Sequence, residues 1–410
     1  MEFYPKNYTA KLPAIILFLY VIVRFSFLPI SFLPGFENQY IAYALGAVGC
    51  ICFAREFIHT KQFKYVFAFV LAAFFNLIID KSMNLGLVLS ICFILLATGF
   101  ISYYILEKDV SGKFGKVVII TFFVITAVYT VQTFLFSTRW PGIMRSAAMS
   151  YNQDYFRPYF RLGLAPYEFP HSIPCLIPAL IMVIKDKNQS KWLRLACLSI
   201  MFMIMVLIYV TQATGPLLVG ILAFILAIVT KKGTIQSNRR KVLCIAIVCL
   251  PFIVSSSLQL AIIQGAEEIV GNDSHYYSKL AELEASAKGE EGEDGDIATR
   301  GELLGATLAA ISKNPIIGVN DKSFGSHNAM LDIWAEYGII GFLPLLLYII
   351  AQINYTKKKI PEDCQMFYLI GAYSTVLMLF FKGMFGWHIW FAFIVMLPLL
   401  TRYLSNYSSK

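Results

Sequence analysis

Charged residues are scarce in this sequence. Asp, Glu, Lys and Arg make up 14% of the chain, whereas a soluble domain contains about 25%. Apolar residues make up 58%, and the mean hydropathy is +0.66. So few charges cannot cover a water-facing surface of this size, which excludes an ordinary soluble protein. Apolar runs near the ~20-residue length that spans a bilayer recur along the chain, and no separate soluble domain is visible.

The cysteines offer neither a disulfide framework nor a zinc site. Seven of the eight lie in apolar runs, Cys364 lies in a short polar loop, and none lies in a long polar segment. We interpret them as small buried hydrophobes. The sequence also lacks a P-loop, a GxGxxG segment after a strand and an HExxH motif, so ATP hydrolysis on the cytoplasmic side has no support. The first apolar run lacks a small-residue cleavage site, and we expect it to be retained as a helix.

The apolar runs predict an all-α integral membrane protein with about twelve transmembrane helices and two long external loops. Expected helices lie at about 12–28, 39–54, 65–79, 85–106, 117–136, 172–184, 193–213, 215–230, 242–262, 328–353, 365–382 and 389–403. The chain is therefore divided into 1–136 (helices 1–5), 137–171 (external loop), 172–262 (helices 6–9), 263–327 (large external loop) and 328–410 (helices 10–12).

Positive charge predicts the orientation. Alternate connections and both termini carry 22 Lys and Arg residues, and the opposite connections carry 10, of which nine lie in the two long loops. Short positively charged connections stay in the cytoplasm, while long loops translocate largely regardless of charge. We therefore expect both termini in the cytoplasm of a bacterial inner membrane and the long loops on the periplasmic or external face. The net charge of +9 follows from this topology and does not indicate nucleic acid.

The first long loop, 137–171, combines arginine with aromatic residues. Arginine offers a planar, permanently charged group that fits phosphate, and aromatic rings stack on sugars or anchor a loop at the lipid interface. Plain interfacial anchoring is the competing interpretation. The arginines are Arg139, Arg145, Arg157 and Arg161, and the aromatic residues are Trp140, Tyr151, Tyr155, Phe156, Tyr159, Phe160, Tyr167 and Phe169.

The second long loop, 263–327, ends beside a polar face. Residues 300–312 have helical apolar spacing, and Asn314-Pro315 is expected to end that helix. In the next helix, Asn328, Asp332 and Glu336 are spaced four residues apart on an otherwise apolar span, and such groups tend to face a cavity or a partner. His327 precedes them and is a candidate general base, because the pKa of histidine lies near neutrality. A structural role at the helix start, with Ser326 or His327 as the cap, is the alternative.

These segments resemble the O-antigen ligase/polymerase superfamily, which includes WaaL-like ligases and Wzy-like polymerases. The resemblance is strongest over 299–341 and extends more weakly back to about 160. The matching segments are Arg161-Leu-Gly163, Thr211-Gln-Ala-Thr-Gly-Pro-Leu217, Thr299-Arg300-Gly-Glu302, Asn314-Pro-Ile-Ile-Gly318 and His327 through Gly341.

The resemblance implies an inverting, metal-independent membrane glycosyltransferase, similar in fold to type C glycosyltransferases, that needs no cofactor. Its donor is a glycan linked through pyrophosphate to undecaprenol. Arg300 and Arg161 are then expected to hold the pyrophosphate, His327 to act as the base, and Glu336 to orient the local structure. We also expect Arg157, Asn328 and Asp332 to contact substrate, and membrane lipid and a chain-length regulator protein to be partners.

One departure favours a polymerase over a ligase. Many ligases have Thr-x-Ser-Arg or Thr-x-Thr-Arg where this chain has Thr211-Gln-Ala-Thr214, so Thr214 occupies the expected arginine position. An O-antigen ligase acting on lipid A core is the main alternative. A transporter of lipid-linked glycan should show two related halves and charges spread through several helices, and neither is evident. A non-catalytic assembly protein is the remaining class.

Overall fold

The computed structural model of the protein describes residues 57–79, 85–109, 112–149, 153–236, 238–240, 260, 263–268, 275–288, 296–319, 328–381 and 386–404. Within these ranges the regular secondary structure is helical throughout, as expected for an all-α membrane protein. The expected helices at 12–28 and 39–54, and nearly all of 242–262, lie outside the described residues.

Seven described helical segments are long and apolar enough to cross a membrane. Four are single helices: Lys61–Ile79 (α3), Lys113–Arg139 (α5), Lys191–Val210 (α10) and Ala329–Lys359 (α16). The segment Val88–Lys108 combines most of α4 (Leu85–Tyr103) with a π-helical continuation (Tyr104–Lys108), and Glu362–Phe380 combines a 3-10 turn (Glu362–Cys364) with most of α17 (Gln365–Phe381). The segment Glu168–Lys185 consists of α8 (Glu168–Ser172), a 3-10 turn (Ile173–Leu176) and α9 (Ile177–Lys185). Two shorter apolar segments are Thr214–Val229 (α11) and Trp387–Tyr403, which comprises α18 (Trp387–Phe391), a π-helical turn (Ala392–Met396) and α19 (Leu397–Tyr403).

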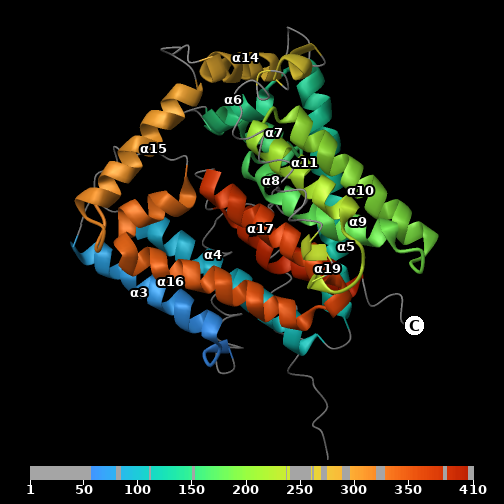
Figure 1. Ribbon diagram of the computed structural model, residues 1–410, viewed down its shortest axis with the longest axis horizontal. Helices are drawn as coiled ribbons and strands as arrows, with labels where there is room; N and C mark the ends of the chain where they lie inside the picture. The colour runs from blue at the N-terminus through green and yellow to red at the C-terminus, as the bar shows by residue number, and fades with distance from the viewer. Residues whose placement is uncertain are drawn as a thin grey trace, which may run out of the picture.

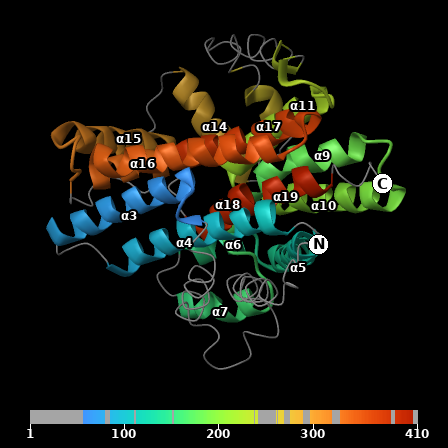
Figure 2. The same ribbon diagram turned by 90° about the horizontal axis from the view of Figure 1, so that it is seen from below.

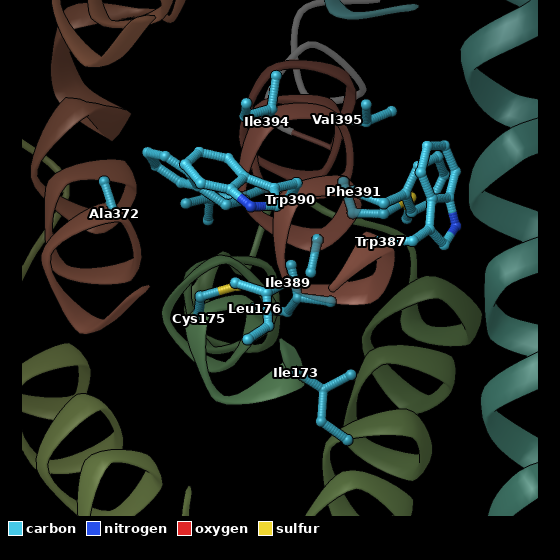
Figure 3. Close-up of a cluster of buried hydrophobic side chains, with 14 of the residues drawn as sticks. Ile173, Cys175, Leu176, Ala372, Trp387, Ile389, Trp390, Phe391, Ile394 and Val395 are labelled. Atoms are coloured by element: carbon cyan, nitrogen blue, oxygen red, sulfur yellow. The ribbon is translucent and has the colours of Figure 1, made fainter. Parts of the chain in front are cut away.

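The core lies where the chain from α8 to α9 meets the C-terminal helices. Figure 3 shows Cys175 and Leu176 beside Ile389 and Trp390, with Ala372 of α17 to the left of Trp390. All five side chains are at most 2% exposed. A Cβ at Gly371 would collide with the carbonyl oxygen of Cys175, so α17 lies against the backbone of the 3-10 turn.

A second packed group consists of α3, α16 and α15 (Asp296–Lys313). Figure 2 shows the outer half of α16 between α15 and α3, and both helices contact α16. On α3, Phe69, Ala73 and Asn76 are buried, whereas Phe67 and Phe75 are about half exposed. The apolar exposed face fits contact with lipid, and the buried face packs on α16.

The connections expected in the cytoplasm are bonded to one another. Glu107 forms an ion pair with Lys359 at 2.8 Å, and Asp186 forms one with Lys232 at 2.6 Å. The Arg402 guanidinium donates to the carbonyl oxygen of Leu106 at 2.7 Å. These connections therefore lie at one end of the helical bundle, and their placement in the cytoplasm stays a prediction.

Both long connections contain helices. The first holds α6 (Ile143–Met149) and α7 (Gln153–Arg161), and α5 runs three residues past its expected end at 136. The second holds α14 (His275–Lys288) and α15, which lie along the upper and left margins of the molecule in Figure 1. The helix expected at 300–312 is confirmed as part of α15, which ends at Lys313, directly before Asn314-Pro315.

Candidate functional site

Hydrogen bonds of Asp332 connect α15 to the start of α16. The Thr307 hydroxyl, on α15, lies 2.9 Å from the carbonyl oxygen of Leu303 and 3.3 Å from Asp332 Oδ1. The other carboxylate oxygen, Oδ2, accepts the backbone N–H of Asn328 at 3.0 Å. Asp332 therefore binds both the helix that carries Arg300 and the residue that follows His327. Figure 1 shows α15 and α16 meeting at the left side of the molecule.

Asn328 occupies the N-cap position of α16, so the helix begins at Ala329, one residue later than expected. Its dihedral angles, φ −143° and ψ 81°, are not helical. The cap bond comes from Asp332, whose carboxylate reaches back to the backbone N–H of Asn328 as in a capping box. The expected polar stripe thus consists of the N-cap residue Asn328 and two residues on the helix, Asp332 and the half-buried Glu336. Asp332 and Glu336 are one helical turn apart.

α16 is interrupted at Gly338, where φ is 63° and ψ is −173°. Residues 314–319, which follow α15, lie against this break and are called the 314–319 segment below. The backbone N–H of Val319 donates to the carbonyl oxygen of Ala335 at 2.7 Å, and the N–H of Ile339 donates to that of Pro315 at 2.9 Å. The Asn-Pro-Ile-Ile-Gly and Glu-x-Gly-Ile-Ile-Gly motifs are therefore two sides of one contact.

Two glycines make this contact possible. Gly318 and Gly338 both have positive φ, 93° and 63°, a backbone region that favours glycine. A Cβ at Gly318 would collide with the carbonyl oxygen of Glu336, and a Cβ at Gly338 would collide with that of Ile316. The Trp334 indole also donates to the carbonyl oxygen of Pro315, at 3.2 Å.

Helix α3 also takes part in this contact, through Asn76. The Asn76 side-chain amide lies 3.2 Å from the carbonyl oxygen of Ile317 and 3.4 Å from that of Glu336. Sequence analysis did not select Asn76, although it is the one strongly polar residue of the run 65–79. Thr307 was missed as well, because a lone threonine in an amphipathic helix has no distinctive spacing.

The structure tests the remaining predicted residues only in part. His327 lies outside the described residues. Arg157 and Arg161 belong to α7 and Arg300 to α15, and the structure describes their backbones but not their side chains. Arg157 and Arg161 are one helical turn apart, and Arg300 lies seven residues before Thr307, roughly 10 Å along the helix axis. Their pyrophosphate contacts stay predictions.

The Arg161-Leu-Gly163 stretch ends α7. Gly163 has φ +100°, and a Cβ there would crowd Val128 and Gln132 of α5 at 3.0–3.1 Å. The N–H of Leu164 donates to the carbonyl oxygen of Tyr159 at 2.9 Å, as at many helix C-termini. The motif therefore sets where α7 ends and the chain turns toward α8.

The Thr211–Leu217 stretch contains the turn between α10 and α11 and the first residues of α11. Gln212 has a left-handed φ of 54°, which costs on the order of 1 kcal/mol or more for a residue with a side chain. Thr214, at the expected arginine position, is the first residue of α11. A cleft of about 210 Å³ lies beside this turn, lined by Phe134, Ser137, Thr138, Pro141, Gly142, Tyr209, Val210 and Gln212.

The aromatic residues of the first long connection pack mainly on one another. The Trp140 ring lies 5.4 Å from that of Phe156, and the Phe136 ring lies 5.3 Å from that of Tyr159, between centroids. Tyr155 is 57% exposed and lies 6.2 Å from Trp140. The competing interpretation of this loop, anchoring at the interface, is consistent with the packing, and Tyr155 keeps a free face for a sugar or for lipid. Among the residues that the structure describes, no three His, Cys, Asp or Glu side chains are grouped as metal ligands.

The fold and site define a class: a multi-pass helical membrane protein in which a long polar connection is folded onto the end of a spanning helix. Residues 173–346 match the family model described as Wzy_C, O-antigen ligase, and this range contains α15, the 314–319 segment and the break in α16. These residues are thus similar to the O-antigen ligase domain of the superfamily named above, whose members are membrane glycosyltransferases of the O-antigen ligase/polymerase type. No curated protein matches the chain.

Proposed function

We propose that this protein is a polysaccharide polymerase. It transfers a glycan from undecaprenyl pyrophosphate to a sugar hydroxyl of a second lipid-linked repeat unit. The bond between the anomeric carbon and the pyrophosphate oxygen breaks as the hydroxyl oxygen attacks from the opposite face. The products are a longer lipid-linked glycan, undecaprenyl pyrophosphate and a proton.

The observation that carries this proposal is the Thr307–Asp332–Asn328 contact. It holds α15, which bears Arg300, against the start of α16, which follows His327. An inverting transfer needs a cationic group at the leaving pyrophosphate and a base at the attacking hydroxyl. Two helices fixed to each other at this point can hold both groups at a constant separation, and loosely connected loops cannot.

The predicted arginines and His327 have separate roles in this scheme. Arg300, together with Arg161 or Arg157, neutralises the charge that develops on the pyrophosphate as the bond breaks. His327 accepts the proton of the acceptor hydroxyl. The transfer is inverting, because the hydroxyl attacks the anomeric carbon on the face opposite the pyrophosphate. It needs no metal, because pyrophosphate is already a good leaving group once it is bound by arginine.

Polymerase is favoured over ligase by Thr214. A threonine at the first position of α11 cannot supply the phosphate-binding charge that the ligase pattern places there. An O-antigen ligase that transfers glycan to lipid A core is the second candidate, and it is the activity in the description of the matched family.

The remaining proposals concern topology and partners. The full chain has twelve transmembrane helices, with both termini in the cytoplasm and the site on the external face of the bacterial inner membrane. The bonds among the cytoplasmic connections support one common side for them. A chain-length regulator is the proposed protein partner, and co-purification from membranes tests that association.

The choice of acceptor tests the proposed function. Purified protein is incubated with an undecaprenyl-pyrophosphate-linked repeat unit, either alone or together with lipid A core. A ladder of longer lipid-linked glycans from the repeat unit alone is the expected result. Product that forms only when lipid A core is present indicates a ligase. No transfer to either acceptor, combined with movement of intact donor across proteoliposomes, indicates a transporter.

A further inference from the structure

Asn76 is a buried amide near the C-terminal end of the apolar helix α3. Its side chain is 5% exposed, and it lies on the face of α3 that packs along α16. A buried polar side chain is costly unless it is hydrogen-bonded. The amide group carries two N–H donors, and two carbonyl oxygens lie within reach of them, those of Ile317 and Glu336.

The two carbonyl oxygens belong to different segments, and the break in α16 explains why both need a donor. In an uninterrupted helix, the N–H of Ile339 would donate to Ala335 and that of Ile340 to Glu336. Here these two N–H groups donate to Pro315 at 2.9 Å and to Ile316 at 3.4 Å instead. The break therefore leaves two carbonyl oxygens of α16 to be satisfied by other donors.

One of the two is satisfied from the 314–319 segment, because the N–H of Val319 donates to the carbonyl oxygen of Ala335 at 2.7 Å. The other, that of Glu336, accepts from the Asn76 amide. The same amide also reaches the carbonyl oxygen of Ile317, so it ties the 314–319 segment and the break to α3 at once. No apolar side chain at position 76 could replace either bond.

We propose that Asn76 is a positioning residue of the glycosyl transfer. Its two hydrogen bonds, to the carbonyl oxygens of Ile317 and Glu336, are called the lock below. They hold the 314–319 segment against the break in α16, and so fix the outer part of α16, residues 329–337, relative to α3. That part begins directly after His327 and contains Asp332, which holds α15. The inference rests on the proposed function for its effect on rate. The lock itself is a property of the fold and can be measured separately.

Loss of the lock should lower the rate of transfer more than donor binding. A displacement of about 1 Å between reacting groups can cost up to 10²-fold in rate. Asn76→Leu keeps most of the side-chain volume and removes both donors. In purified enzyme we expect kcat to fall on the order of 10- to 100-fold and the KM for the lipid-linked donor to stay unchanged. The matched control is Gln62→Leu, which removes another buried amide of α3, 6% exposed and far from the break along the helix.

Backbone hydrogen exchange measures the lock without any activity. In Asn76→Leu the N–H groups of Val319 and Ile339 should lose protection, whereas in Gln62→Leu they should keep it. If Asn76→Leu fails to fold, Asn76→Ser takes its place, since its short hydroxyl cannot reach both carbonyl oxygens.

A wild-type kcat in the Asn76 variant of an otherwise active enzyme would overturn the positioning role. Full protection of Val319 and Ile339 in that variant would overturn the lock. If the wild-type protein itself transfers no glycan, the proposed function fails, and hydrogen exchange still decides whether Asn76 holds the junction.

Discussion

Gly318 packs directly against Gly338, so that a Cβ added to Gly318 would lie 2.7 Å from the backbone nitrogen of Gly338. Gly338→Ala should therefore separate the 314–319 segment from α16. It also places a side chain at φ 63°, where L residues are strained. We expect a loss of about 2–3 kcal/mol in stability, measured as a lower Tm in detergent, together with loss of polymer.

The control for this variant is Gly305→Ala in α15. A Cβ at Gly305 meets no atom within 4 Å, and alanine favours a helix by up to about 1 kcal/mol over glycine. Gly305→Ala should leave the Tm unchanged or raise it. Equal Tm values for Gly338→Ala and wild type would show that the close approach at the break is not needed.

Arg300 is expected to bind the leaving pyrophosphate. Arg300→Ala should abolish polymer at unchanged protein level, and Arg300→Lys should also be poor, because an ammonium cannot make the bidentate contact of a guanidinium. Polymer length and amount are measured in membranes from complemented cells. Lys313→Ala, at the other end of α15, is the control. Wild-type polymer in Arg300→Ala cells would remove this residue from the mechanism.

The Asp186–Lys232 pair should make stability depend on pH. Burial alone would raise the pKa of Asp186, but the hydrogen bond and charge of Lys232, 2.6 Å away, together with the N–H of Asn188, hold it below the ordinary value of 3.8. A lowered carboxylate pKa stabilises the folded state above pH 3.8, and this stabilisation is lost as the pH falls through the folded pKa.

Asp186→Asn should therefore lower the Tm at pH 7 and make little difference below the folded pKa. The expected loss at pH 7 is on the order of 1 kcal/mol, since Lys232 is partly exposed and screened by solvent. Thermal unfolding in detergent between pH 7 and pH 3 checks this. Lys231→Gln removes the charge of the neighbouring exposed lysine, is the control and should change nothing. A Tm deficit of Asp186→Asn that is the same at every pH would contradict the assignment.

Reporter fusions test the orientation. Fusions near residues 188, 236 and 358 should read cytoplasmic, and fusions near 150 and 290 should read external. The opposite result at 150 or 290 would place the candidate site on the wrong side of the membrane for an external lipid-linked glycan.

Local sequence patterns predict much of this fold. Asn314-Pro315 ends α15 because proline cannot continue a helix, and the apolar runs give α3, α5 and α10 to within a few residues at most ends. By contrast, the composition of residues 137–171 predicts a loop, and the chain there forms α6 and α7. The two helices have only seven and nine residues, which is too short for a helical spacing to stand out among the Arg and aromatic residues of this segment.

The contact at the break in α16 could not be predicted from the sequence. The two glycine motifs lie 20 residues apart, and nothing in either specifies that the N–H of Ile339 pairs with Pro315. Asn76 lies about 240 residues away along the chain, and its bonds go to backbone carbonyl groups, which leave no residue-type signature. The polar stripe draws attention to Asp332, whose predicted contact with substrate stays a prediction, but its bond with Thr307 follows only from the packing of α15 on α16.

The most direct test of the account is the pH–rate profile of purified enzyme with the lipid-linked repeat unit, for wild type, His327→Ala and His327→Gln. If His327 is the base, both variants lose roughly 10²–10⁴-fold in rate. The wild-type rate falls as the pH drops below the histidine pKa, near about 6.5 for an unperturbed side chain, and this acid limb is absent from both variants. A His327→Gln enzyme that keeps most of its activity and the same acid limb would contradict general-base transfer by this residue.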